Sequence, residues 1–286
     1  MFARRAVRLR QAILGDPGPG PSNFAPQIDL PRPQLNQFKT YKAFHYDCVP
    51  HQRLQDMAGS LVELDLSFRR PPAYHNYTGA VIQFPHLRRL VIMDEQLLGC
   101  FQTPALTELC IGHFQSFNPL TSFFNRSGFN LTSFKVIRYI RSTLLQLVPF
   151  LRHFPNLCTL AVDGFGDDEA MFSMKDLIAA LVASPPESDI LCPLLTSLSL
   201  GDFGDLLVEV KLRSALVEMV RTRSMEGAPY VIEGRCAYLK SFSVYGNLVK
   251  LRGAAHRIRS MGIQVEALTG EAARRAVNNW RNYYNM

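Results

Sequence analysis

The sequence predicts an α/β fold in which short parallel strands alternate with helices, and two observations predict it. The first is a six-residue pattern, L-x-x-L-x-L, in which other aliphatic or aromatic residues also occupy the leucine positions. Its seven copies begin at Leu61, Leu87, Leu106, Leu131, Leu157, Leu195 and Leu239. The second is that several of the intervening segments carry apolar residues at helical spacing. The first four intervals between copies bracket the period of about 20 to 29 residues that is typical of leucine-rich repeats, and the last two require insertions.

The pattern predicts which side chains are buried. In a strand, alternate side chains point to opposite faces, so the fourth and sixth residues of a copy, such as Leu64 and Leu66, share one face. One short strand cannot bury these leucines alone, but stacked parallel strands form a continuous core, and each return needs a crossover. For residues 57–265 we therefore predict a leucine-rich-repeat solenoid, with a parallel β-sheet on its concave face and irregular helices on its convex face.

The residues before each copy also recur. Proline stands two residues before the first leucine in four copies, a place that suits the approach to a strand because proline ends a preceding helix. These residues are Pro85, Pro104, Pro155 and Pro193. One residue earlier, the same register is held by Phe84, Phe154, Cys192 and Cys236. We predict that these four side chains are core residues.

Three connecting segments are predicted to be helices. Apolar residues from Met174 to Val182 have helical spacing, with Ser173 as the expected N-cap and Pro185-Pro186 as the stop. A second helix is expected over residues 206–225, and a third from Ser142 to Phe154. Pro149 lies inside the third segment, so that helix is either kinked or starts there. Residues 69–83 show little helical pattern and are expected to be an irregular connection.

The two flanks differ from the repeats. Residues 1–56 are expected to be a basic and proline-rich N-terminal segment, partly disordered. Residues 266–286 are expected to form a C-terminal helix, with Trp280 and Ala273 on one face. This helix would either cap the open end of the solenoid or bind a partner through Trp280.

Composition limits the classes of function. The chain has 286 residues, 47% of them hydrophobic, which is ample for a core. No apolar run approaches the roughly 20 residues of a membrane helix, so no membrane partner is expected. The net charge is +7, but no continuous basic face is visible, so nucleic acid is not the expected partner. A cytoplasmic or nuclear location is expected; the alternative is mitochondrial targeting by residues 1–14, which are basic and amphipathic.

No motif predicts catalysis. Nucleophile elbows, phosphate-binding loops and zinc-protease motifs are absent, and the six cysteines form no C-x-x-C pair. We therefore expect no enzyme activity, no cofactor and no metal. The expected partner is a protein, either a substrate or a regulatory protein.

The expected binding surface is the outward face of the strands. Aspartates recur just beyond the strand ends, and we hypothesise an acidic rim with aromatic anchors that receives a basic partner segment. The alternative is that these aspartates only cap helices or make turns. The candidate partner-binding residues are Asp94, Asp163, Phe165, Asp167, Asp168, Asp202, Phe203, Ser199, Ser243 and Tyr245.

The stretch from about Leu131 to Leu268 resembles the C-terminal part of fungal F-box proteins. The matching segments are SGFNLTSFKVI, LLQLVPFLRHFPNLCTLAVDGF, ILCPLLTSLSLGDF, ALVEMVRTR, YLKSFSVYG and HRIRSMGIQVE. The resemblance implies that the repeats hold a substrate for a cullin-type ubiquitin ligase. No F-box itself is evident, so the cullin adaptor is a partner only if one exists. The alternative is a repeat scaffold or regulatory protein with no ligase link.

Overall fold

The computed structural model describes residues 11–14, 38–44, 51–67, 80–93, 95–112, 116–139, 141–164, 170–183, 190–201, 210–224, 231, 233–245 and 248–268. The chain divides into two compact units. Unit 1 comprises Met1–Ile111, Asn118–Asn130 and Arg281–Met286, and unit 2 comprises Gly112–Phe117 and Leu131–Trp280. Both units combine parallel strands with helices, so the predicted α/β class with a parallel sheet is confirmed.

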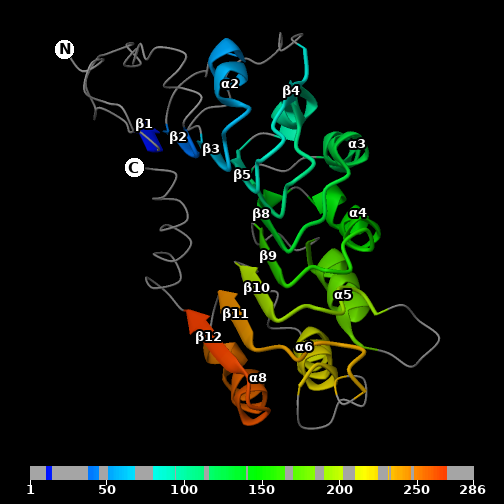
Figure 1. Cartoon of the computed structure of the whole chain (residues 1–286). Helices are drawn as coiled ribbons and strands as arrows, with labels where there is room; N and C mark the ends of the chain where they lie inside the picture. Colours follow the sequence, from blue (N-terminus) through cyan, green and yellow to red (C-terminus); the bar gives the residue numbers. More distant parts are fainter. Residues whose placement is uncertain are drawn as a thin grey trace. The chain divides into compact units, whose positions relative to one another are not determined.

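Unit 1 contains parallel strands that adjoin in the order β1-β2-β3-β5-β7 (Figure 1). Their bounds are β1 (Gln11–Leu14), β2 (Thr40–Phe44), β3 (Glu63–Ser67), β5 (Arg89–Ile92) and β7 (Glu108–Ile111). The last three are the pattern copies that begin at Leu61, Leu87 and Leu106. Two short strands, β4 (Ile82–Gln83) and β6 (Phe101–Gln102), form a separate parallel pair.

The helices of unit 1 were not predicted. They are α2 (His51–Met57), the 3-10 helix η2 (Glu95–Cys100) and α3 (Phe117–Ser127), whose first residue belongs to unit 2. α2 has only seven residues, and only two of them, Leu54 and Met57, are buried. Two buried residues are too few to reveal a helical period in the sequence. In α3 a proline follows two residues after the start, where the helix does not need its missing N–H.

Unit 2 contains parallel strands in the order β8-β9-β10-β11-β12. Their bounds are β8 (Ser133–Tyr139), β9 (Thr159–Gly164), β10 (Ser197–Gly201), β11 (Ser241–Tyr245) and β12 (Gln264–Leu268). The first four are the remaining pattern copies, so all seven copies form strands. β12 extends two residues past position 266, where the C-terminal helix was expected, and residues 269–286 lie outside the described residues.

The helices of unit 2 pack on one another in chain order, α4 on α5, α5 on α6 and α6 on α8 (Figure 1). Their bounds are α4 (Arg141–Leu151), α5 (Ala170–Leu181), α6 (Val210–Thr222) and α8 (Leu248–Ser260). This row follows from the strand order, because neighbouring parallel strands receive neighbouring crossovers. Among the described helices, none combines the length and the hydropathy needed to cross a bilayer.

One detail of the predicted helices is wrong, and one alternative is excluded. α5 begins at Ala170, three residues before Ser173, so Ser173 lies within the helix and is not its N-cap. Ala170 and Met171 are strong helix formers and extend it toward the N-terminus. α4 runs from Arg141 through Pro149 rather than starting at the proline. The predicted 206–225 helix is observed as Val210–Thr222, and most of the 69–83 connection lies outside the described residues.

The core matches the pattern. Leu64 and Leu66 are 0% and 1% exposed, and Leu198 and Leu200 have the same values. Phe84, Phe154, Cys192 and Cys236 are also buried, as predicted from their shared register. In unit 2 the ring of Phe150 lies between those of Phe117, Phe134 and Phe154, at centroid distances of 5.4, 5.6 and 5.0 Å. The ring of Phe150 therefore packs against three other buried rings of unit 2.

Candidate functional site

The outward face of the unit 2 sheet carries small, mostly polar side chains. Phe134, Leu160, Leu198 and Phe242 face the core and are at most 2% exposed. The residues between them are partly exposed and form two rows, which we call the floor. The first row is Ser133, Thr159, Ser197 and Ser241, and the second is Lys135, Ala161, Ser199 and Ser243. The predicted outward orientation of Ser199 and Ser243 is therefore confirmed.

The floor is set by the register of the strands. Ser197 is aligned with Thr159 on one side and with Ser241 on the other. Neighbouring strands lie about 4.8 Å apart, so these short side chains form a close-spaced hydroxyl surface. The Ser241 Oγ donates a hydrogen bond to the Ser197 Oγ at 2.9 Å. Because the parallel ladder occupies the strand backbone, the polar groups that this floor offers to a ligand are its hydroxyl groups and the ammonium of Lys135.

The start of each strand is fixed by the preceding one. The carbonyl of Cys158 accepts hydrogen bonds from the N–H groups of Thr196 and Ser197 at 2.9 and 3.0 Å. The carbonyl of Thr196 accepts in the same way from Lys240 and Ser241 at 2.8 and 3.1 Å. These paired bonds hold the N-terminal edge of the sheet, where the strands begin.

Two large apolar side chains are exposed at this edge. Leu194 is 44% exposed and Tyr238 is 38% exposed, and each directly precedes the first leucine of its pattern copy. The N–H of Ala237 donates to the carbonyl of Pro193 at 2.7 Å, which brings the two turns together. The Nζ of Lys240 lies 5.4 Å from the centre of the Tyr238 ring, within the range of a cation–π contact. We call Leu194, Tyr238 and Lys240 the edge patch. The L-x-x-L-x-L pattern does not reveal this patch.

The corresponding face of unit 1 is different. Its first row carries Glu63, Arg89 and Glu108, and the Arg89 Nε lies 3.8 Å from the Glu108 Oε2. Its second row was expected to be open, but Asp65, Val91 and Cys110 are only 5%, 5% and 8% exposed. Valine and cysteine are apolar and suit burial, so this row is not a second floor.

Most of the predicted acidic rim lies outside the described side chains. Asp163 lies near the end of β9, in register with Ile137 and Gly201. Tyr245 is the last residue of β11, in register with Leu268. The side chains of these two residues are not described, and the remaining rim residues lie outside the described ranges. These are Asp94, Phe165, Asp167, Asp168, Asp202 and Phe203. The acidic rim stays a prediction.

A buried arginine supports the unit 2 framework. Arg223 directly follows α6 and is 0% exposed. Its Nε donates to the carbonyl of Leu181 at 2.7 Å, its Nη1 to that of Cys192 at 3.0 Å and its Nη2 to that of Leu191 at 2.6 Å. Leu181 is the last residue of α5, whose carbonyl has no partner within its own helix. Arg223 therefore caps α5 and ties it to the turn before β10.

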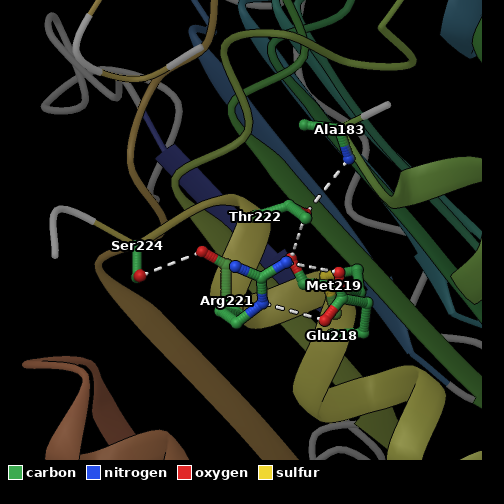
Figure 2. Close-up of polar contacts among 6 residues, drawn as sticks. All are labelled: Ala183, Glu218, Met219, Arg221, Thr222 and Ser224. Atoms are coloured by element: carbon green, nitrogen blue, oxygen red, sulfur yellow. Dashed lines mark hydrogen bonds and ion pairs between the residues drawn. The ribbon is translucent and has the colours of Figure 1, made fainter. Parts of the chain in front are cut away.

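Thr222 makes a second link between α5 and α6, as Figure 2 shows. Its Oγ1 accepts from the N–H of Ala183 at 3.1 Å and donates to the carbonyl of Met219 at 2.9 Å. In the same view Arg221 turns outward and pairs with Glu218, with an Nη2–Oε1 distance of 2.7 Å. Arg221 and Arg223 therefore have opposite environments, although one residue separates them.

The cysteines near Arg223 are protonated at neutral pH. Burial raises the pKa of the Cys192 thiol to about 12 and also raises that of Cys236, although the Arg223 charge opposes both shifts. Burial lowers the pKa of Arg223 itself. A thiol with so high a pKa is a poor nucleophile. The two side chains thus act as core residues.

Neither a metal site among the described residues nor a match to a known protein identifies the function. Within the described ranges, no three His, Cys, Asp or Glu side chains come together as metal ligands would. No model of a known protein family matches the chain, and no curated protein matches it. The geometry of the floor and its edge is therefore what indicates a function.

Proposed function

We propose that the chain is a leucine-rich-repeat protein that binds another protein on the floor of unit 2. The observation that carries the proposal is the alignment of two rows of small outward side chains in parallel strands whose other face is core. Such a floor lets the main chain or a helix of a partner approach closely. The solenoid form of the fold belongs to this proposal, supported by seven pattern copies that all form parallel strands.

The polarity of the floor favours a protein partner over a small apolar ligand. Small-molecule pockets are concave and lined mainly by apolar and aromatic groups around a few polar ones. The floor instead offers the hydroxyls of Ser197, Ser199, Ser241 and Ser243 in two rows, with no aromatic side chain among its residues. Hydroxyl side chains adapt as donors and acceptors, which suits the polar contacts of a protein interface.

The resemblance to fungal F-box proteins supports one specific role. Nearly all of the stretch that carries it, from about Leu131 to Leu268, falls within unit 2, which also holds the floor; only the start of the first matching segment, from Ser127, belongs to unit 1. The role would be that of a substrate receptor for a cullin-type ubiquitin ligase. The alternative remains a scaffold or regulatory protein without a ligase link. A pull-down of a cullin adaptor by the purified chain distinguishes the receptor from the scaffold, since only a receptor with an F-box retains the adaptor.

The test of protein binding places a photo-crosslinking amino acid at Ser199 and, as a control, at the exposed Ser260 of α8. We expect discrete cross-linked partners from position 199 that are absent from position 260. The double variant Ser199→Arg and Ser243→Arg should prevent capture of the same partners because it fills the floor. The matched variant Ser122→Arg and Ser260→Arg, on helices, should not. Equal cross-linking from both positions would remove the proposal.

A further inference from the structure

The edge patch combines two features that are uncommon on the described surface. Large hydrophobic side chains that stay exposed among the described residues are Val81, Leu194 and Tyr238. Two of these three stand at equivalent places in adjacent turns of unit 2. An exposed leucine beside an exposed tyrosine is typical of a binding contact, because a buried tyrosine or aliphatic anchor contributes strongly to protein interfaces.

The backbone of the edge patch is fixed before any partner binds. Leu195 and Leu239, which directly follow Leu194 and Tyr238, are 0% and 1% exposed and anchor both turns in the core. The Ala237–Pro193 hydrogen bond of 2.7 Å joins the turns. Lys240 is held through its own N–H to Thr196 and through its carbonyl, which accepts from Gln264 at 3.1 Å. A preorganised surface loses less conformational entropy on binding.

The charge of the patch is positive. Lys240 is exposed, and within the described ranges its ammonium faces the Tyr238 ring and no carboxylate lies within 4 Å of it. The acidic side chain described nearest in sequence, Glu233, has its Oε2 3.9 Å from the Nη1 of Arg235. Glu233 is therefore already paired with Arg235 rather than with Lys240. A partner that supplies a carboxylate would neutralise the Lys240 charge, whereas a basic partner would be repelled.

From this geometry we infer that the edge patch recognises an acidic-apolar protein segment, with Asp or Glu next to an aliphatic or aromatic residue. The inference rests on the proposed function, which it deepens by naming the chemistry of the partner. The carboxylate pairs with the Lys240 Nζ, and the apolar side chain packs between Leu194 and Tyr238. The adjoining hydroxyls of Ser197 and Ser241 receive the polar backbone of the segment.

The test uses the full-length protein and a displayed library of random 12-residue peptides. We expect the selected peptides to be enriched in an acidic residue adjacent to an apolar one. A synthetic peptide with that consensus should bind Lys240→Glu about tenfold or more weakly, because a cross-interface attraction becomes repulsion. When the Lys240→Glu variant is the target of the selection, the selected peptides should instead be enriched in basic residues. The control Lys175→Glu, an exposed lysine on α5, should bind like the wild type.

A second variant tests the apolar part. Leu194→Ser with Tyr238→Ser should lose the apolar preference while the thermal unfolding midpoint stays near that of the wild type, since both side chains are exposed. This inference is overturned if the peptides bind both edge variants normally and lose binding only to the variant with Ser199→Arg and Ser243→Arg. That result would leave the proposed function standing. A library that yields no peptide would also overturn this inference. The cross-linking from Ser199 then decides the proposed function separately.

Discussion

Arg223 gives the sharpest test of how unit 2 holds together. Its guanidinium donates to three carbonyls from two segments, and Arg223→Met removes all three donors while filling much of the volume. The carbonyls of Leu181 and Leu191 lose their donor, whereas that of Cys192 keeps the N–H of Leu195 at 3.1 Å. Each buried carbonyl left without a donor costs about 1–3 kcal/mol. The variant also avoids the desolvation of a buried cation, which offsets part of that cost. We therefore expect a net loss of about 2 kcal/mol in the free energy of unfolding.

The loss is measurable by thermal unfolding. In a domain of 150 to 250 residues, about 1 kcal/mol lowers the midpoint by about 2–4 °C, so Arg223→Met should unfold roughly 4–8 °C earlier. Hydrogen exchange should increase at the C-terminal end of α5, which Arg223 caps. Arg223→Lys should recover only part of the loss, because one ammonium cannot reproduce a planar fork that reaches three acceptors.

Arg221→Ala is the matched control. Arg221 lies two residues earlier on the same helix end, but it is exposed and pairs with Glu218 in solvent. Exposed ion pairs contribute little, so the unfolding midpoint of this variant should equal that of the wild type. An Arg223→Met protein that unfolds together with Arg221→Ala would refute the capping argument. An Arg223→Lys protein as stable as the wild type would refute the three-acceptor geometry.

The other predictions concern neighbouring contacts. Thr222→Val should lower the free energy of unfolding by about 1–2 kcal/mol in denaturant titration, because the Ala183 N–H loses its acceptor, whereas Thr222→Ser should not. Phe150→Ala should cost about 3–5 kcal/mol in the same assay, because it opens a cavity among three rings. The pKa of Cys192 is about 12 when folded, against 9.0 ordinarily, so the unfolded state loses this proton first. The contribution of this thiol to the free energy of unfolding is therefore fully present below about pH 9 and is lost as the pH rises from 9 to 12. Cys192→Ala should show a shallower fall, and in the native wild type a thiol reagent should modify the partly exposed Cys158 before Cys192.

The strands were largely predictable because the pattern reports their two faces directly. All seven copies became strands, but β2 was missed although Phe38 and Tyr41 stand where leucines stand elsewhere. Both are buried, at 1% and 3% exposure. An eighth copy starting at Phe38 could have been found by allowing an aromatic residue at the first position. The proline-rich composition of the surrounding segment hid it.

The edge patch and the buried arginine could not be predicted from the pattern. Leu194 and Leu195 are the same residue type, yet one is 44% exposed and the other is 0% exposed. Which of them faces the core depends on the turn before β10, not on hydrophobicity. In the same way, the segment ALVEMVRTR shows two arginines, and only the end of α6 at Thr222 decides which one turns inward.

A second arginine indicates why such residues occur in this chain. In unit 1, Arg126 near the end of α3 donates from Nε and Nη2 to the carbonyl of Phe101 at 3.0 and 2.8 Å, and from Nη2 to that of Leu98 at 2.6 Å. Leu98 lies in η2, so Arg126 and Arg223 each satisfy carbonyls near the end of an earlier helix. The last carbonyls of any helix lack partners within that helix. A long side chain with five donors can reach them from a later segment of the chain. Arg126 in unit 1 and Arg223 in unit 2 therefore solve the same problem, and in unit 2 the solution ties α5 to the turn before β10, one of the strands of the floor.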